Sequence, residues 1–227
     1  AHLGAHYQRK YDRYVEDGLR TSVGDPDRFR TVREKNDSWN YELSGDYQFG
    51  LGPGKLKLIG LRRFSHEPYS QEIVTRFADA TPPEGDRFAQ RGNLGETIAR
   101  GEYQWKMLGG DWELSGEAAF NTLDNVAALY TLDPTGAFVE LPFPGGTGGV
   151  KEDRYESLLS FGRKITDKLN VQIVAGAERS TITQSGANGL TRSFFRPKGS
   201  LSIAWAPAPD FDMSLKIRRR VLQLSFY

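Results

Sequence analysis

The fold of this chain is decided by residues 39–49, which read Trp39-Asn40-Tyr41-Glu42-Leu43-Ser44-Gly45-Asp46-Tyr47-Gln48-Phe49. Apolar residues occupy the odd positions of this run, apart from Gly45, and polar or charged residues occupy the even positions. Because successive side chains of a β-strand point to opposite faces, such a strand has one apolar and one polar surface.

The same alternation returns in four further runs, at residues 99–107, 112–121, 169–175 and 211–218. Strands of soluble proteins usually have about 5 to 6 residues, whereas a tilted strand that crosses a bilayer needs about 9 to 11. The longer runs reach the second length, and their polar faces are strongly charged. The pattern therefore predicts an all-β fold, an antiparallel up-and-down transmembrane β-barrel with lipid outside and an aqueous lumen inside.

Composition agrees with this interpretation and excludes several others. The mean hydropathy of −0.55 would indicate a soluble protein, but a barrel strand gives only every second residue to lipid. No apolar run approaches the roughly 18 residues of a membrane helix. With 30 basic and 29 acidic residues, the chain has no bulk field that would attract nucleic acid. It has no cysteine, which excludes disulfides and thiolate chemistry.

The connections between strands alternate in length. Short turns rich in turn-forming residues fall at residues 50–54, 108–111, 166–168 and 207–210, and longer polar segments fall at 16–37, 68–95, 125–151 and 183–193. Outer-membrane barrels place short turns on the periplasmic side and long loops outside. The landmarks predict about nine strands of a larger barrel, near residues 2–15, 38–49, 55–67, 96–107, 112–124, 152–165, 169–182, 195–206 and 211–226.

Three features predict that residues 1–227 are a single barrel segment that is truncated at both ends. Bacterial single-chain barrels have even strand numbers, and this count is odd. Residues 1–7 have neither the basic nor the apolar region of a signal peptide. The last predicted strand runs directly to the C-terminus at Tyr227.

Aromatic residues lie near the ends of the predicted strands. Such residues form girdles at both surfaces of a membrane barrel, although aromatics also favour strands in general. The girdle beside the short turns would contain Phe49, Trp105, Trp112, Trp205 and Phe211, and the opposite girdle Trp39, Phe120, Tyr155 and Phe195.

Two places do not fit the alternation. Residues 56–64 are apolar on both faces, so the pattern leaves open whether Arg62 or Arg63 points into the lumen, and a β-bulge would resolve it. Pro197 would remove a ladder hydrogen bond from a central strand, so that strand is expected to begin after it or to bend there.

Residues 195–216, which read FRPKGSLSIAWAPAPDFDMSLK, form a strand, a short turn and a returning strand. This segment resembles the barrel of TonB-dependent outer-membrane receptors, particularly receptors of alphaproteobacterial type. The resemblance implies a parent barrel of about 22 strands filled by an N-terminal plug, in the outer membrane of a Gram-negative bacterium. Lipid, the plug, the TonB system and an unknown small ligand would be the partners. Neither a plug nor an energy-coupling box is visible in the sequence.

Residues that could carry chemistry are few. His2 and His6 are four residues apart, which on a strand is roughly 13 Å and too far to share a metal. His66 lies between Ser65 and Glu67, but adjacent strand residues face opposite sides and cannot converge as a hydrolase triad. We therefore expect no enzyme, catalytic residue, metal or cofactor.

Three loop motifs have ordinary explanations. The glycine-rich residues 145–151 lack the Gly-Lys-Ser/Thr ending of a phosphate loop and are expected to form a mobile extracellular loop. The acidic stretches at 25–27 and 84–86 could contact Ca²⁺, yet turn formation explains both.

The remaining candidates are charged residues on the polar faces of the strands. They could pair across the ladder, hold a plug, form a substrate site, or only make a wetted wall. These lumen-facing candidates are Glu42, Asp46, Arg100, Glu102, Lys106, Glu113, Glu117, Lys216, Arg218 and Arg220.

The leading hypothesis is a partial barrel from a TonB-dependent receptor whose parent imports a scarce nutrient such as a siderophore, cobalamin or a glycan. One alternative is a small outer-membrane porin or adhesin that closes by itself and needs a hidden tenth strand. Another is a soluble carbohydrate-binding β-sandwich, whose aromatic residues stack on sugars.

Overall fold

The computed structural model describes residues 1–186 and 189–219, which form one antiparallel sheet of ten strands. The strands are β1 His2–Ser22, β2 Asp25–Leu51, β3 Gly54–Phe77, β4 Glu84–Met107, β5 Gly110–Leu132, β6 Phe138–Leu141, β7 Thr147–Thr166, β8 Leu169–Ser185, β9 Thr191–Ala208 and β10 Phe211–Arg219. Each pairs with the next in sequence except β6, which adds to β5 outside the main order, so that β5 pairs with β7. In the described ranges, no helix is long and apolar enough to cross a membrane.

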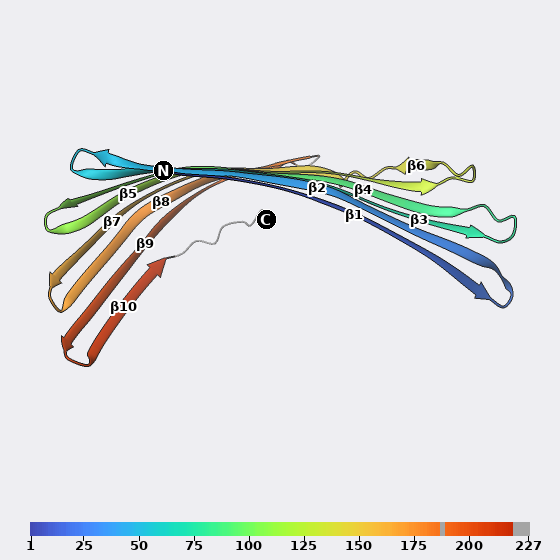
Figure 1. Ribbon diagram of the computed structural model, residues 1–227. Coiled ribbons are helices and arrows are strands. Elements are labelled where there is room, and N and C mark those ends of the chain that lie inside the picture. The colour runs from blue at the N-terminus through green and yellow to red at the C-terminus, as the bar shows by residue number, and fades with distance from the viewer. Residues whose placement is uncertain (187–188, 220–227) are drawn as a thin grey trace.

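The sheet is curved and open (Figure 1). β1 and β10 are the two ends of the strand order and do not pair with each other, so the described strands form a wall and not a closed cylinder. The expected all-β, up-and-down antiparallel arrangement is confirmed. The self-closing barrel of the porin alternative is not what the structure shows.

All four predicted short turns are present between consecutive strands. The chain reverses at residues 52–53, 108–109, 167–168 and 209–210. At the β4–β5 reversal both turn residues, Leu108 and Gly109, have positive φ angles of 55° and 69°. Two-residue turns with positive φ match the right-handed twist of the flanking strands, which explains a tight hairpin there.

The long polar segments are not the irregular loops that the sequence predicts. β1 and β2 run on to Ser22 and Asp25, and β3 and β4 continue to Phe77 and Glu84. In segment 125–151, β5 extends to Leu132, and β6 is a tenth strand. The prediction failed because polar residues on both faces hide the alternation, although a backbone ladder forms regardless of side-chain polarity.

Both irregular places turn out to be regular strand. The β2–β3 register is continuous from Arg28–Phe77 to Leu51–Gly54, so residues 56–64 contain no bulge. β9 runs through Pro197, which pairs with Ala177 of β8, so the strand does not begin after this proline.

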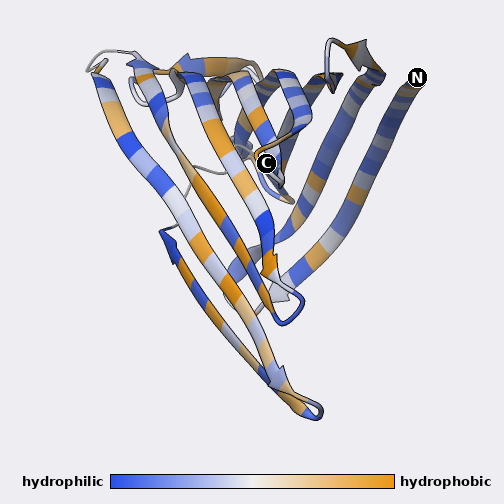
Figure 2. Ribbon diagram, turned by 90° about the vertical axis from the view of Figure 1, so that its left-hand side faces the viewer, coloured by the Kyte–Doolittle hydropathy of each residue, from blue (hydrophilic) through white to orange (hydrophobic). Residues whose placement is uncertain are grey.

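Among the described residues, no second layer of protein covers the apolar face of the sheet. Leu3 is 93% exposed, Phe195 73% and Ile217 59%. Across residues 1–186 and 189–219, the buried hydrophobic residues are only Val32, Val74 and Ala119. Figure 2 shows apolar and polar segments alternating along single strands, as the sequence predicts. A β-sandwich needs the apolar face to pack on a facing sheet, so the soluble sandwich is excluded.

Candidate functional site

The polar face is the concave one. Glu42 of β2 pairs in register with Arg63 of β3, and Arg63 with Glu96 of β4, so the three share a face. Glu96 lines a cavity of about 780 Å³ that continues across to β10. We call this side the concave face and the side that carries Trp39 the convex face. The long ladders keep their register, so alternation assigns each strand residue to one face.

A line of ion pairs begins at Glu42. Arg63 lies between two carboxylates, with Nη2 at 2.7 Å from Glu42 and Nη1 at 3.6 Å from Glu96. Nearer the β2–β3 turn on the same face, the Lys57 ammonium is 3.8 Å from the Asp46 carboxylate. These contacts answer the open question in β3: Arg63 belongs to the concave face, and Arg62 to the convex face.

Three of the predicted candidates meet in the middle of the wall. Arg100 contacts Glu102 at 2.7 Å and Glu117 at 3.6 Å. Glu117 also accepts a hydrogen bond from Arg154 at 2.8 Å. Arg154 is buried among these groups, and cross-strand pairs of opposite charge stabilise adjacent strands.

The most buried charge is one that the sequence analysis missed. Glu178 of β8 is 0% exposed. Its carboxylate forms ion pairs with Nη1 of Arg196 at 2.9 Å and with Nζ of Lys198 at 2.5 Å. Lys198 also contacts Glu156 of β7, and Arg196 reaches Ser180 at 3.3 Å. In β7, β8 and β9, counting every second residue from the apolar positions assigns all four charged residues, Glu156, Glu178, Arg196 and Lys198, to the polar face. The alternation in the sequence therefore contained this signal.

The other predicted candidates lie nearer the rim. Glu113 accepts from Gln104 at 2.8 Å, and Lys106 pairs with Asp111 at 3.4 Å beside an exposed turn. Lys216 and Arg218 line the cavity, and neither has an ion pair within the described residues. Arg220 lies outside the described residues.

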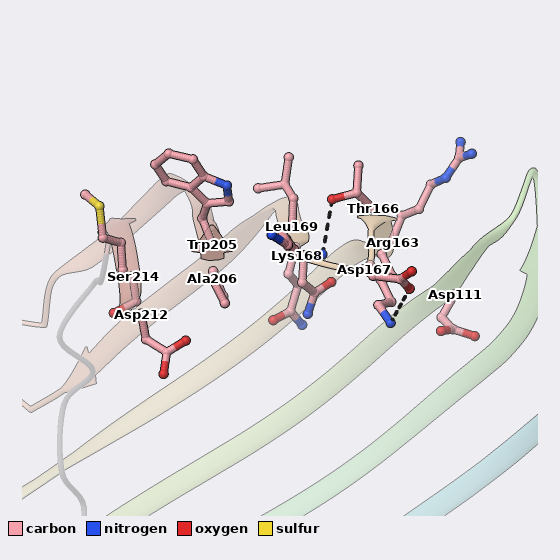
Figure 3. Close-up of a pocket in the computed structure, with 16 residues that line it drawn as sticks. Asp111, Arg163, Thr166, Asp167, Lys168, Leu169, Trp205, Ala206, Asp212 and Ser214 are labelled. Atoms are coloured by element: carbon pink, nitrogen blue, oxygen red, sulfur yellow. Dashed lines mark hydrogen bonds and ion pairs between the residues drawn. The ribbon is translucent and has the colours of Figure 1, made fainter. Parts of the chain in front are cut away.

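A second cavity, of about 850 Å³, lies among the short turns of β5 and β7–β10. Figure 3 shows its residues splitting by face: Trp205 and Leu169 project to one side of the ribbon, and Asp111 and Asp212 to the other. The carboxylates are therefore concave, and the aromatic ring is on the convex face.

The predicted aromatic girdle residues beside the short turns occupy the convex face. Trp105 stacks on Tyr103 at 5.2 Å and lies 6.1 Å from Trp112, whose ring lies 4.6 Å from Phe161. These rings form a continuous row across β4, β5 and β7. Phe49 and Trp205 lie on the same face of other strands, and Phe211 begins β10 beside a shift in the β9–β10 register.

A second convex cluster lies toward the other end of the strands. Trp39 lies 5.4 Å from Phe64 and 5.5 Å from His66. Further along the sheet, Phe120 and Tyr155 meet edge to face at 5.9 Å. Between the two clusters, most convex positions carry small or aliphatic side chains, such as Leu43, Gly60 and Leu114, and Arg62 beside Phe64 is a charged exception.

The motifs set aside in the sequence remain without a site. Among the described residues, no three His, Asp or Glu side chains gather where a metal could bind. His66 lies 2.7 Å from the amide oxygen of Asn93. The glycine-rich residues 145–151 do not form the expected loop, because β7 begins at Thr147.

One loop carboxylate has a clear electrostatic signature. Asp133 follows β5 and accepts hydrogen bonds from the Thr135 hydroxyl at 2.6 Å and from the backbone N–H of Ala137 at 2.9 Å. These donors favour the charged form and lower the pKa of Asp133 below its ordinary value.

No protein-family model matches the sequence, and no curated protein matches it significantly. Solved structures with a similar course of strands include the siderophore receptor PiuA from Acinetobacter baumannii, at 9% identity and TM-score 0.41 over 91% of this chain and 47% of that chain. The ferric citrate transporter FecA has 9% identity and a TM-score of 0.40, over 93% of this chain and 38% of that chain. FauA from Bordetella pertussis, an alcaligin receptor, has 8% identity and a TM-score of 0.34, over 95% of this chain and 42% of that chain.

The neighbours are TonB-dependent outer-membrane receptors. They belong to the class that residues 195–216 resemble. The chain spans less than half the length of each of the three. At these TM-scores and identities, the likeness assigns no residue, ligand or partner to this chain.

Proposed function

We propose that this chain is a single segment of barrel wall, without a plug of its own, from a TonB-dependent receptor in the outer membrane of a Gram-negative bacterium. The parent receptor would import a scarce, bulky nutrient such as a siderophore, cobalamin or a glycan. In this proposal the convex face contacts lipid and the concave face lines the lumen.

One observation carries the proposal: a large apolar surface lies on one side of a single sheet, and the charges lie on the other. Monomeric soluble proteins rarely expose contiguous apolar patches larger than a few hundred Å². Here the convex face presents Leu43, Leu58, Leu114, Leu159 and Ile217, each between 40% and 59% exposed. Hydrocarbon can cover these apolar side chains. It leaves no backbone polar group of the inner strands without a partner, because these groups are already hydrogen-bonded within the sheet.

The spacing of the two aromatic clusters supports the same orientation. On β5, Trp112 and Phe120 are eight residues apart, which is about 26 Å along a strand. At the usual tilt of about 40°, this is roughly 20 Å across the membrane, close to the apolar band of about 25 Å in outer-membrane barrels. The short turns then lie on the periplasmic side, and the long hairpins extend outside.

The charged concave face is suited to hold another polar body. Glu178, Glu117 and Glu42 are engaged by cations of the same wall, whereas Lys216 and Arg218 have no carboxylate partner in the described part of the sheet. We propose that the paired residues fix the wall, and that the unpaired cations contact the plug or an acidic group of the ligand.

The proposal is tested by refolding the full chain from urea into detergent micelles and into phosphatidylcholine vesicles. Folded barrel material should resist trypsin and should migrate differently on gels with and without heating. Lipids brominated along their acyl chains should quench Trp105, Trp112 and Trp205. A soluble monomer that folds without detergent would overturn the assignment.

A matched pair of variants makes the test specific to the faces. Leu114→Gln changes an exposed convex residue, and Glu113→Gln changes its neighbour on the concave face. Only the first should weaken insertion into vesicles. Equal effects of the two changes would contradict a lipid-facing convex side.

A further inference from the structure

Two cations face each other across the β1–β2 ladder on the convex face. Arg13 pairs in register with Lys35, and both side chains are exposed. The register between these strands is unbroken from His2–Asp46 to Arg20–Arg28, so both residues share the face of Trp39. Like charges directly opposite each other destabilise a sheet unless an anion compensates them.

The nearby carboxylates of this surface already have partners. Asp37 receives both Nε and Nη2 of Arg9, at 2.8 Å and 2.9 Å. Glu72 receives Arg33 at 3.3 Å. Within residues 1–186 and 189–219, neither Arg13 nor Lys35 makes an ion pair. The charge of Lys35 acts on Asp37 at longer range, but that carboxylate is already held by Arg9, so the Arg13–Lys35 pair remains open to an anion from outside.

Two further cations extend the patch along the same face. Arg91 of β4 is exposed and makes no ion pair in the described ranges. Arg62 of β3 donates to the Thr97 hydroxyl at 2.8 Å and lies over the Phe64 ring. Its guanidinium lies over Gly95, because a Cβ added to that glycine would be 3.5 Å from Nη1 of Arg62. The Arg62 side chain therefore extends along the sheet toward the long hairpins.

The position of the pair relative to Trp39 defines the kind of anion. Lys35 is four residues beyond Trp39, about 13 Å along the strand and roughly 10 Å in height at the usual tilt of about 40°. Aromatic girdle residues mark the level of the lipid headgroups. Arg13 and Lys35 therefore lie roughly 10 Å outside the level of Trp39, and their long side chains reach back toward the lipid phosphate groups, which are the abundant anions there.

We propose that Arg13, Lys35 and Arg91, with Arg62 below them, form a binding surface for phosphate groups of anionic lipids in the outward-facing leaflet. The inference rests on the membrane location proposed above. The bound phosphate neutralises the Arg13–Lys35 pair and holds the β1–β4 part of the wall at a fixed depth.

The experiment is native mass spectrometry of the full chain refolded in zwitterionic micelles, with equal amounts of phosphatidylglycerol and phosphatidylcholine of the same acyl chains. The chain should retain phosphatidylglycerol preferentially. Because a cation near a membrane surface contributes about five-fold in affinity, the Arg13→Gln/Lys35→Gln variant should lose about thirty-fold.

A matched control removes two charges from the same strands on the other face. Lys10 and Arg30 lie on the concave side of β1 and β2, and Lys10→Gln/Arg30→Gln should keep the lipid preference. Lys35→Glu gives Arg13 a carboxylate partner, so it should stabilise the hairpin and still abolish the preference. This variant separates lipid binding from folding.

The outcomes are distinguishable. If the chain does not refold in micelles, the membrane proposal itself fails. If it refolds but retains both lipids equally, or if the two double variants behave alike, the lipid surface is wrong. If inorganic phosphate displaces the lipid as effectively as phosphatidylglycerol does, the surface is only a phosphate site and the lipid assignment fails.

Discussion

A charge placed at Gly116 gives the most direct test of which side of the sheet contacts hydrocarbon. Gly116 is exposed on the convex face of β5, four residues from Trp112 and four from Phe120. A Cβ built there meets nothing within 4 Å, so a substitution causes no collision. The position is therefore both sterically open and close to the middle of the apolar band.

The expected cost follows from this depth. An arginine at the midplane of a membrane barrel costs about 2–4 kcal/mol, and near the interfaces about 0–1 kcal/mol. Gly116→Arg should lower the free energy of unfolding by about 2–4 kcal/mol relative to Gly116→Ala. The alanine variant is the reference because both changes remove the same glycine flexibility.

The assay is urea unfolding of the chain from phosphatidylcholine vesicles, followed by tryptophan fluorescence and extrapolated linearly to water. The control is Ser202, which lines the concave cavity on β9. Ser202→Arg and Ser202→Ala should differ by less than about 1 kcal/mol, as expected for a wetted surface. A difference of under about 0.5 kcal/mol at Gly116, or equal penalties at both sites, would refute the assignment of the faces.

Three further predictions concern single sites. Glu178→Leu leaves two cations without their buried partner and should destabilise the refolded chain by about 3–5 kcal/mol in the same urea assay, with a smaller loss for Glu178→Gln. The pKa of Asp133 is lower in the folded chain than in the unfolded chain. Its hydrogen bonds therefore stabilise the loop fully at pH values above the unfolded-state pKa, and this stabilisation is lost as the pH falls through the folded-state pKa. Pepsin cleavage within residues 133–141 should therefore rise below about pH 4, relative to Asp133→Asn. Gly109→Val, at φ +69°, should cost about 1–2 kcal/mol, whereas Gly109→Asn should cost less.

The sequence was sufficient for the membrane-crossing part of each strand. There, hydrocarbon on one side and water on the other impose opposite demands on alternate residues, so Trp39 to Phe49 reveals its two faces directly. The short turns were equally readable, because a tight reversal such as Leu108-Gly109 restricts the residues that can occupy it.

The sequence failed where that contrast disappears. In the outer half of β1 to β4, both faces are polar, so residues 16–37 look like a loop although most of them are paired strand. The charged wall was only partly predicted for a related reason. Glu42 and Glu117 stand in runs with clear alternation, while Glu178 follows the small residues Ala175, Gly176 and Ala177, which carry little hydropathic contrast.

The sequence alone could not decide which of Arg62 and Arg63 faces the lumen, because the residues around them are apolar on both faces of the strand. The ladder separates them, since Arg63 meets two carboxylates on the concave face and Arg62 meets a hydroxyl and a ring on the other. Cross-strand partners are long-range information, and a local pattern does not contain them.

The unbroken pairing of β2 with β3 has a consequence for how such a wall is put together. A slip of β3 by one residue would send Arg63 into the hydrocarbon and turn Leu58 toward water, and the same exchange would occur at every position along that strand. An error of assembly is thus penalised along its whole length at once, so the bilayer itself can reject misaligned hairpins before they become part of the finished protein.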